Sequence, residues 1–122
     1  SKAVLCVNHD YRPTETVKMD GKAQHLYPRK NWSSFMLLNC EHPETQRLTP
    51  EVVNSETGKY LHQFGWCADE YLGELPVTFN YLEGWHTKDH EPDPVCVHFT
   101  RGGPWFSGYQ DVEYADEWRA YL

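Results

Sequence analysis

Residues that could bind a charged ligand are concentrated between positions 95 and 105, where the sequence reads Val-Cys-Val-His-Phe-Thr-Arg-Gly-Gly-Pro-Trp. His98 offers an imidazole, a common protein ligand of metal ions, and Arg101 offers a guanidinium that suits phosphate oxygens. Gly102 and Gly103 permit a turn whose backbone amides face an anion. This composition predicts a site for an anionic or metal-bound ligand.

A β-strand must present these residues. Apolar and other side chains alternate from Val95 to Thr100, which is the period expected of a strand with one buried face. Pro104 has no N–H to donate to a sheet, so the strand ends at the glycine turn, and Trp105 follows it. His98 is therefore expected directly before a turn rich in backbone amides.

The run from His98 to Phe106 resembles the H-x-x-G-x-x-K-P-W run of nucleotide-sugar glycosyltransferases of the glycogenin-like and galactosyltransferase-like group, which have the GT-A fold. The stretches 8–11 and 27–34 are similar to an uncharacterised bacterial branch of predicted glycosyltransferases. The resemblance implies that His98 helps to hold the divalent cation, Mn²⁺ or Mg²⁺, on the diphosphate of the donor. Arg101 and Gly103 depart from the pattern, which has glycine and lysine there, and this puts the family's phosphate-binding lysine in doubt.

The same resemblance implies further site residues. The sugar pocket would be lined by the start of segment 33–39, which we predict as the strongest core strand, and by the residues just before it. Those implied to bind substrate are Asn31, Trp32, Ser33 and Ser34. Arg101, Gly102, Gly103 and Trp105 are predicted to bind substrate from the chemistry of the glycine turn itself. Asp69 and Glu70 are implied to bind the acceptor or to act in catalysis. A helix-capping Asp69 and a solvated Glu70 are the equally weighted alternative.

Two other polar segments have a simpler interpretation beside a functional one. Arg29 and Lys30 could bind a phosphate or an acidic sugar, but a solvated basic pair is favoured. Segment 83–94 contains His86 and His90 among several acids. Its prolines remove the rigid helical spacing that a metal site would need, so a solvated loop is favoured there.

The composition excludes some classes of partner. The 122 residues include 11 Lys and Arg against 18 Asp and Glu, a formal charge of −7. An acidic chain without a basic patch is not expected to bind nucleic acid or an anionic membrane. No apolar run has the roughly 18 residues of a membrane helix, so we expect a soluble protein, and the cysteine pattern favours the reducing cytoplasm. Its four cysteines, without a C-x-x-C pair, are expected to be buried free thiols.

The predicted fold is α/β (α+β), as one domain over 1–122. Residues 2–7 form an apolar strand, and Asp20-Gly21 suits the turn of an exposed hairpin over 16–26. Helices are expected after Thr49-Pro50-Glu51 and after Ser55 or Thr57, the second closed by Gly65. A C-terminal helix is expected over 114–122, with its aromatic side chains on one face that packs on the core. The result is a small mixed sheet with short helices on one face, resembling half of a GT-A domain.

The Asp-x-Asp by which such enzymes hold their cation is absent from this sequence. The chain is therefore not expected to be catalytic alone. Three interpretations remain. The chain is part of, or partner to, a transferase whose nucleotide-binding half lies elsewhere, or it is a stand-alone binding or oligomerising module derived from the acceptor half. In the third, the resemblance is misleading. The expected ligands are a nucleotide sugar or a glycan, with a cation only if the other half is supplied. A half-domain exposes a sheet edge, so we expect a homodimer or a complementing N-terminal half.

Overall fold

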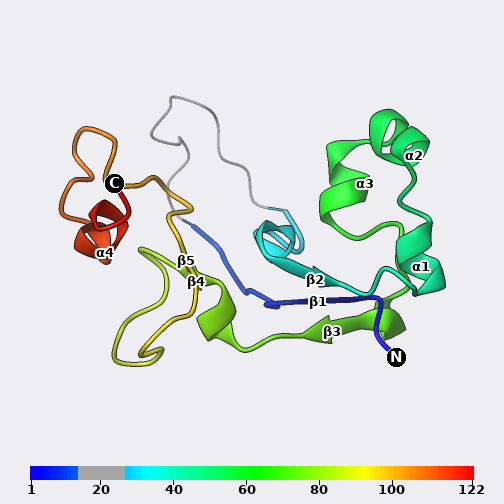
Figure 1. Cartoon of the computed structure of the whole chain (residues 1–122), viewed down its shortest axis with the longest axis horizontal. Helices are drawn as coiled ribbons and strands as arrows, with labels where there is room; N and C mark the ends of the chain where they lie inside the picture. The colour runs from blue at the N-terminus through cyan, green and yellow to red at the C-terminus, as the bar shows by residue number, and fades with distance from the viewer. Residues whose placement is uncertain (14–26) are drawn as a thin grey trace. The chain divides into compact units, whose positions relative to one another are not determined.

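The computed structural model describes residues 1–13 and 27–122, and the chain divides into two compact units (Figure 1). Unit 1 comprises residues 1–10 and 27–76, and the described part of unit 2 comprises 11–13 and 77–122. Short helices and short strands make this a small mixed α+β protein, which confirms the predicted class. The hairpin expected over 16–26 lies outside the described residues, and the single domain stays a prediction.

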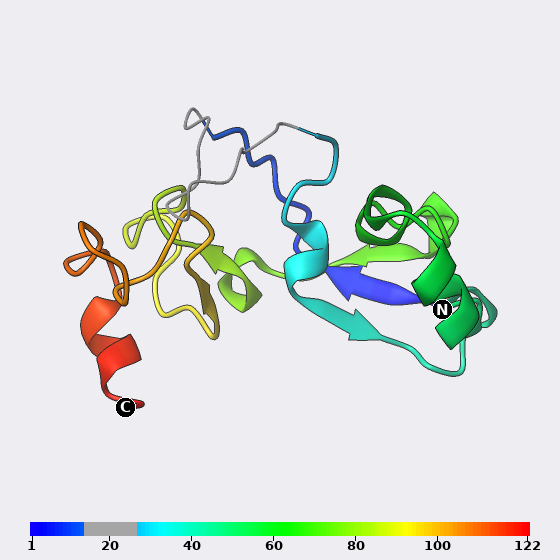
Figure 2. The same ribbon diagram turned by 90° about the horizontal axis from the view of Figure 1, so that it is seen from above.

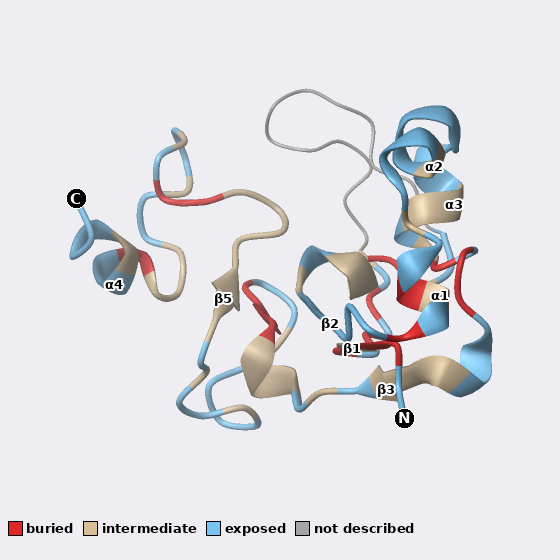
Figure 3. Cartoon of the chain, turned by 45° about the vertical axis from the view of Figure 1, so that its right-hand side comes forward, coloured by how far each residue is buried: buried red, intermediate tan, exposed pale blue. Residues whose placement is uncertain are grey.

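The three strands of unit 1 form one mixed sheet with β1 in the middle (Figure 2). β1 (Val4–Cys6) pairs antiparallel with β2 (Met36–Leu38) and parallel with β3 (Leu72–Glu74). Val4 and Cys6 of β1 are buried, and so are the residues on either side of the strand, Ala3 and Val7 (Figure 3). The apolar run at 2–7 is thus a buried central strand, as predicted.

The prediction of a core strand over 33–39 is wrong. Ser33 and Ser34 lie in the 3₁₀-helix η1 (Trp32–Ser34), and β2 is an edge strand. Met36, Leu37 and Leu38 have exposed fractions of 42%, 57% and 37%. An apolar run indicates a strand, but it does not specify whether that strand becomes the centre or the edge of a sheet.

Three short helices follow β2, and their starts obey local capping rules. They are α1 (Pro43–Gln46), α2 (Pro50–Ser55) and α3 (Gly58–His62). The Thr49 hydroxyl accepts a hydrogen bond from the Val52 amide at 3.3 Å, and the Thr57 hydroxyl accepts one from the Tyr60 amide at 3.1 Å. Each hydroxyl satisfies an amide that has no partner within its helix. The predicted start of α2 is confirmed, and Thr57 rather than Ser55 caps α3.

The end of α3 differs in one detail from the prediction that Gly65 closes it. Phe64, with φ of 58°, adopts the left-handed conformation, while the Gly65 amide donates to the Tyr60 carbonyl at 2.8 Å. This is the bonding pattern that commonly ends helices, but here a buried phenylalanine occupies the position that glycine usually takes. Phe64 and Trp66 pack edge to face in the core with Ala3, Val4, Cys6 and Cys67.

The remaining elements are short. Two 3₁₀-helices, η2 (Asp69–Tyr71) and η3 (Val77–Phe79), flank β3 along the chain. In unit 2, β4 (Tyr81–Leu82) pairs parallel with β5 (Val97–His98), so the predicted strand before the glycine turn exists but is shorter. None of the described helices is long and apolar enough to cross a membrane.

The C-terminal helix also differs from the prediction. α4 covers only Ala115–Arg119, and Tyr114 precedes it in a left-handed conformation with φ of 65°. Tyr121 and Leu122 lie beyond the helix and are 92% and 88% exposed. The predicted aromatic stripe is therefore wrong at these two positions, because the helix ends before they could join its buried face.

All four cysteines are free thiols. Cys6 and Cys67 are buried, as predicted, whereas Cys40 is exposed and Cys96 is partly buried. Burial raises the pKa of Cys6 to about 11. This thiol is accordingly a core residue that stays protonated at neutral pH, not a nucleophile.

Gly65→Ala should destabilise the protein by about 1–3 kcal/mol, because an added Cβ would lie 2.6 Å from the Tyr60 ring and force it to move. Gly58→Ala is the matched control, since its Cβ would lie 3.8 Å from the nearest atom of His62. Urea unfolding followed by circular dichroism measures both variants. Equal stability of the two variants would contradict the packing seen around Tyr60.

Candidate functional site

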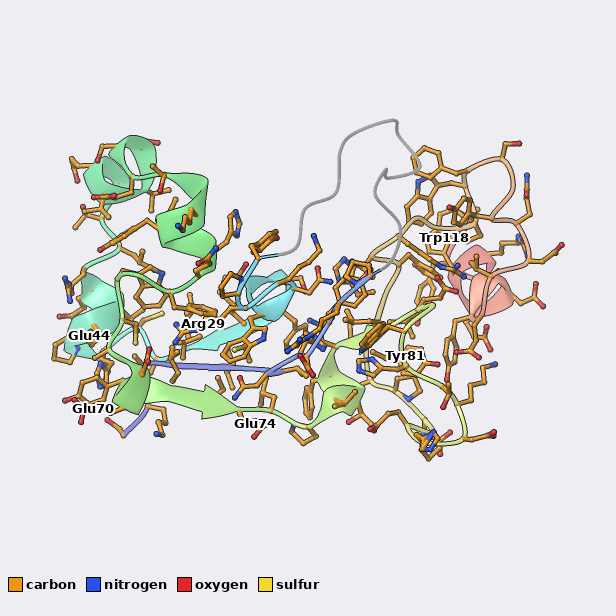
Figure 4. All side chains as sticks on the ribbon, turned by 180° about the vertical axis from the view of Figure 1, so that it is seen from behind. Arg29, Glu44, Glu70, Glu74, Tyr81 and Trp118 are labelled. Atoms are coloured by element: carbon orange, nitrogen blue, oxygen red, sulfur yellow. The ribbon has the colours of Figure 1, made fainter. Side chains whose placement is uncertain are left out.

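In unit 1 the candidate site centres on the guanidinium of Arg29, labelled in Figure 4. Its Nη2 lies 2.6 Å from Oδ1 of Asp69, and its Nη1 donates to the Gln63 carbonyl at 2.9 Å. The same guanidinium lies 5.4 Å from the centre of the Trp32 ring, within the range of a cation–π contact. One side chain thus joins the loop before η1 to the start of η2.

The loop that carries Arg29 is held in an unusual backbone conformation. Arg29 and Asn31 have φ of 58° and 67°. Such angles cost about 1–3 kcal/mol per residue other than glycine and persist where the surroundings impose them. Here the Trp32 indole donates to the His9 carbonyl at 2.7 Å, and the Ser33 hydroxyl lies 2.8 Å from Nδ1 of His62. These contacts fix the predicted sugar-binding stretch against the rest of unit 1.

The structure brings Asp69 together with this stretch. Asp69 bonds to Arg29, which contacts Trp32, and the Asp69 side chain is 81% exposed. The alternative that Asp69 caps a helix is wrong, because Ala68 is the N-cap of η2 and no side chain caps it. Glu70 is exposed, and its backbone carbonyl accepts a bond from Lys2 at 2.7 Å. The exposed Glu70 agrees with the solvated alternative, and Asp69 is the carboxylate that is bonded to the loop through Arg29.

Arg29 and Lys30 are not the solvated basic pair that the sequence favoured. Arg29 bonds within unit 1, and Lys30 is only 6% exposed with its Nζ 4.6 Å from the centre of the Tyr27 ring. A cation on an aromatic face loses less on leaving water than one without a partner. Both charges therefore stabilise the loop, and a phosphate would have to compete with these contacts.

The other predicted residues lie in unit 2. Its central contact is a two-bond ion pair: the Arg101 Nε and Nη2 atoms lie 3.0 and 2.8 Å from the two carboxylate oxygens of Glu83. Glu83 is 2% exposed, and a buried carboxylate needs such a partner. Gly84, with φ of 82°, lies against Arg101 so closely that a Cβ would overlap the guanidinium. Arg101 was predicted to bind an external anion, but its guanidinium is bonded to an internal one.

The rest of the turn is built by packing. The Trp105 ring lies over Gly103, where a Cβ would overlap it, and packs on Trp118 with ring centres 5.2 Å apart. Gly102 has φ of 139° and its amide donates to the Phe99 carbonyl at 3.1 Å. Gly103 and Trp105 thus have a structural role in the packing of the turn, and their predicted role in substrate binding stays a prediction.

His98 lies in β5 and is partly buried, with its backbone carbonyl accepting bonds from the amides of Glu83 at 3.0 Å and Thr100 at 2.9 Å. Among residues 1–13 and 27–122, no group of three or more His, Cys, Asp or Glu side chains is arranged to hold a metal ion. One imidazole does not complete a coordination shell, so the divalent cation, expected only with the nucleotide-binding half supplied, stays a prediction. Additional ligands would have to come from elsewhere.

A buried polar group in unit 2 was missed by the sequence reasoning. Tyr81, also labelled in Figure 4, is fully buried, and its hydroxyl bonds to the Glu113 carboxylate and lies 3.0 Å from the His86 carbonyl oxygen. Burial, followed by the bond to Glu113, raises the pKa of Tyr81 well above its usual value. The sequence could have indicated a buried tyrosine, because Tyr81 stands beside Leu82 in the short strand β4. Its carboxylate partner could not be predicted, because Glu113 lies 32 residues away in the sequence.

Segment 83–94 is mostly an exposed loop, as predicted, but His86 is not solvated. Its ring is partly buried and packs on Tyr81, and its Nδ1 accepts a hydrogen bond from the Leu82 amide at 2.8 Å. That bond requires Nδ1 to be unprotonated, so the neutral ring carries its proton on Nε2. Burial lowers the pKa of His86 from its usual value of 6.5.

Comparisons with known proteins give one curated relative above the level of chance. The chain is 53% identical over 119 residues to a protein of Arabidopsis thaliana named "Protein CDI". The match covers 95% of this chain and 46% of the plant protein, so the chain spans about half the length of that relative. No protein family matches the chain. No solved structure matches it either.

We expect His86 to make stability pH-dependent. Because its folded pKa is below 6.5, the unfolded state binds more protons than the folded state at lower pH, so the free energy of unfolding should fall as pH drops below that value. His86→Gln should flatten this dependence, as measured by urea unfolding across the acidic range. His90→Gln removes an exposed histidine from the same loop and is the matched control. An unchanged slope in His86→Gln would contradict the assignment.

Proposed function

We propose that this chain is the acceptor-side part of a metal-dependent nucleotide-sugar glycosyltransferase and that it binds a sugar beside Trp32 and Asp69. The observation that carries the proposal is that the Arg29 guanidinium contacts both the Asp69 carboxylate and the Trp32 ring. The resemblance described above implies substrate-binding or catalytic roles for Trp32 and Asp69, and they come from segments about 37 residues apart in the sequence. Their meeting at one guanidinium supports the reading of both as one site.

The chemistry of the cluster suits a sugar. The C–H face of a pyranose packs on an aromatic ring, and a carboxylate accepts hydrogen bonds from sugar hydroxyls. Asp69 is accessible, and Arg29 orients it through a charge-assisted bond. A carboxylate held in this way can also accept the proton of an acceptor hydroxyl as a general base. Glu70, the next residue, is exposed and is the second candidate for this role.

Other parts of a complete enzyme must come from outside the described residues. The described residues include His98 but no group of several metal ligands. The proposal therefore assigns no role to a bound cation in this chain alone. More than half of the plant relative lies outside the matched region, which is compatible with a nucleotide-binding half there. The chain alone is accordingly proposed to bind an acceptor sugar without transferring one.

Thermal unfolding in the presence of methyl glycosides of glucose, galactose and mannose tests the sugar site. A ligand of the folded state should raise Tm by about 1–5 °C at concentrations well above Kd. Asp69→Asn should abolish the rise at little cost to stability, since its ion pair is exposed. Glu41→Gln, which removes another exposed carboxylate of unit 1, is the matched control.

Two results would count against the proposal. One is the absence of a shift with every glycoside, or an equal shift in Asp69→Asn. The other is a shift with Mn²⁺ and a nucleotide sugar that is lost in His98→Ala, because this would make the chain a donor-binding enzyme by itself.

The edge strand β2 favours a second candidate function, a self-associating module. Among the described residues β2 has β1 as its strand neighbour on one side, and its three apolar side chains are exposed. An exposed apolar edge can pair with the same edge of another copy, because both supply unpaired backbone groups. The expected occupant is therefore a second copy of this chain.

Light scattering at micromolar concentration should then give the mass of a dimer, and Leu37→Lys should give a monomer, since a charge on an edge strand opposes pairing. Val53→Lys is the matched control, because Val53 is similarly exposed at 47% but lies on α2. A monomeric wild-type chain, or a dimer that survives Leu37→Lys, would exclude this edge as the interface.

A further inference from the structure

Unit 2 contains a cavity of about 430 Å³ between the segment leading into β5 and helix α4. This volume lies within the range of small-molecule sites. The walls are mainly aromatic and aliphatic side chains, with two carboxylates. The lining residues are Asp93, Pro94, Val95, Val97, Phe99, Tyr114, Glu117, Trp118 and Tyr121.

Three of the aromatic walls, Trp118, Phe99 and Tyr114, pack on neighbouring rings, whereas Tyr121 is 92% exposed. Trp118, labelled in Figure 4, packs on Trp105 with ring centres 5.2 Å apart, and Trp105 packs edge to face on Phe99 at 5.8 Å. Tyr114 packs edge to face on the buried Tyr81 at 5.3 Å. Because neighbouring rings support Trp118 and Tyr114, the cavity offers preformed aromatic faces to a ligand.

The charged side chains that line the cavity in the described part of unit 2 are both acidic. Among the described residues of the lining, Asp93 and Glu117 are the charged ones, and these described residues include no Lys, Arg or His. Burial, followed by the charges of Glu113, Glu117 and Asp93, raises the pKa of Tyr114, so these carboxylates act on the ring that lines the cavity. The Lys88 ammonium, which is not among the described lining residues, lies 4.4 Å from the centre of that ring, so Tyr114 already contacts one cation of the protein with which a cationic ligand would have to coexist.

Two residues of the lining have a backbone conformation that is rare outside glycine. Asp93 has φ of 53° and Tyr114 has φ of 65°. Such conformations cost free energy and are often found at ligand sites, where they orient particular side chains. Here they occur at one of the two carboxylates and at one of the aromatic walls.

We propose that this cavity binds a small organic cation with a methylated ammonium group. Aromatic faces attract cations through their negative quadrupole, and a weakly hydrated quaternary ammonium leaves water at a lower cost than a primary one. Two carboxylates add attraction for a positive charge and repel an anion. A neutral sugar would gain nothing from the charge of the cavity. The proposal does not depend on the sugar site, because all the lining residues lie in unit 2.

Isothermal titration with choline, compared with 3,3-dimethylbutan-1-ol, tests this inference on the whole chain. The alcohol has the same shape without the charge, so it reports apolar burial alone. Choline should bind at least about fivefold more tightly than the alcohol, and its affinity should fall as salt is added. Equal binding of the two compounds, or no choline binding at tens of millimolar, would overturn the proposal.

Two variants of α4 locate the site. Glu117→Gln should weaken choline binding about threefold to tenfold, because it removes a carboxylate of the lining. Asp116→Asn makes the same change of charge on the neighbouring residue of the same helix, which does not line the cavity, and should change Kd less than about twofold. Equal effects of the two substitutions would show that choline senses only the net charge of the helix and would reject the site. Binding of methyl glucoside in place of choline would reject the proposed ligand class.

Discussion

The buried carboxylate of Glu83 is the constraint on which the arrangement of unit 2 depends. A carboxylate that is 2% exposed must be paired, and Arg101 supplies two bonds to it. Removing Arg101 would leave the Glu83 carboxylate buried without this partner, which is strongly destabilising. The pair ties the end of β4 to the turn after β5 and explains why glycine is needed at position 84, where the guanidinium passes. The turn that the sequence marks as a ligand site is thus held by an internal anion.

Arg29 has the corresponding role in unit 1, but in a more exposed setting. It bonds to a carbonyl and a carboxylate and stacks on a tryptophan, so the loop is fixed by several contacts of one side chain. Because Asp69 is largely exposed, its ion pair contributes little to stability, and its carboxylate remains accessible to a ligand. Arg29 fixes the loop, whereas the Asp69 carboxylate remains accessible. The cluster is therefore a candidate binding site as well as a structural contact.

The two candidate sites differ in the ligands they suit. The cluster at Arg29 combines a cation, an anion and an indole, and can therefore exchange hydrogen bonds with the hydroxyls of a sugar. The cavity beside α4 combines rings with two carboxylates and suits a positive charge. Their residues lie in different units, so the chemistry of each follows from its own neighbours.

Local rules sufficed for several elements of the fold. The sequence alone indicated the α+β class, the buried strand at β1, the helix start at Thr49-Pro50 and a strand carrying His98 before a glycine turn, because capping, apolar runs and turn residues act over a few positions. The resemblance also directed attention to Asp69 and Trp32. Only the tertiary structure decided that Met36 to Leu38 form an edge, that Arg101 is bonded to Glu83, and that Tyr81 meets Glu113. The two side-chain contacts join residues that lie 18 and 32 positions apart in the sequence, and the edge position of β2 depends on which strands pair with it. A local sequence pattern specifies neither the distant partner of a side chain nor the number of strands that flank a strand.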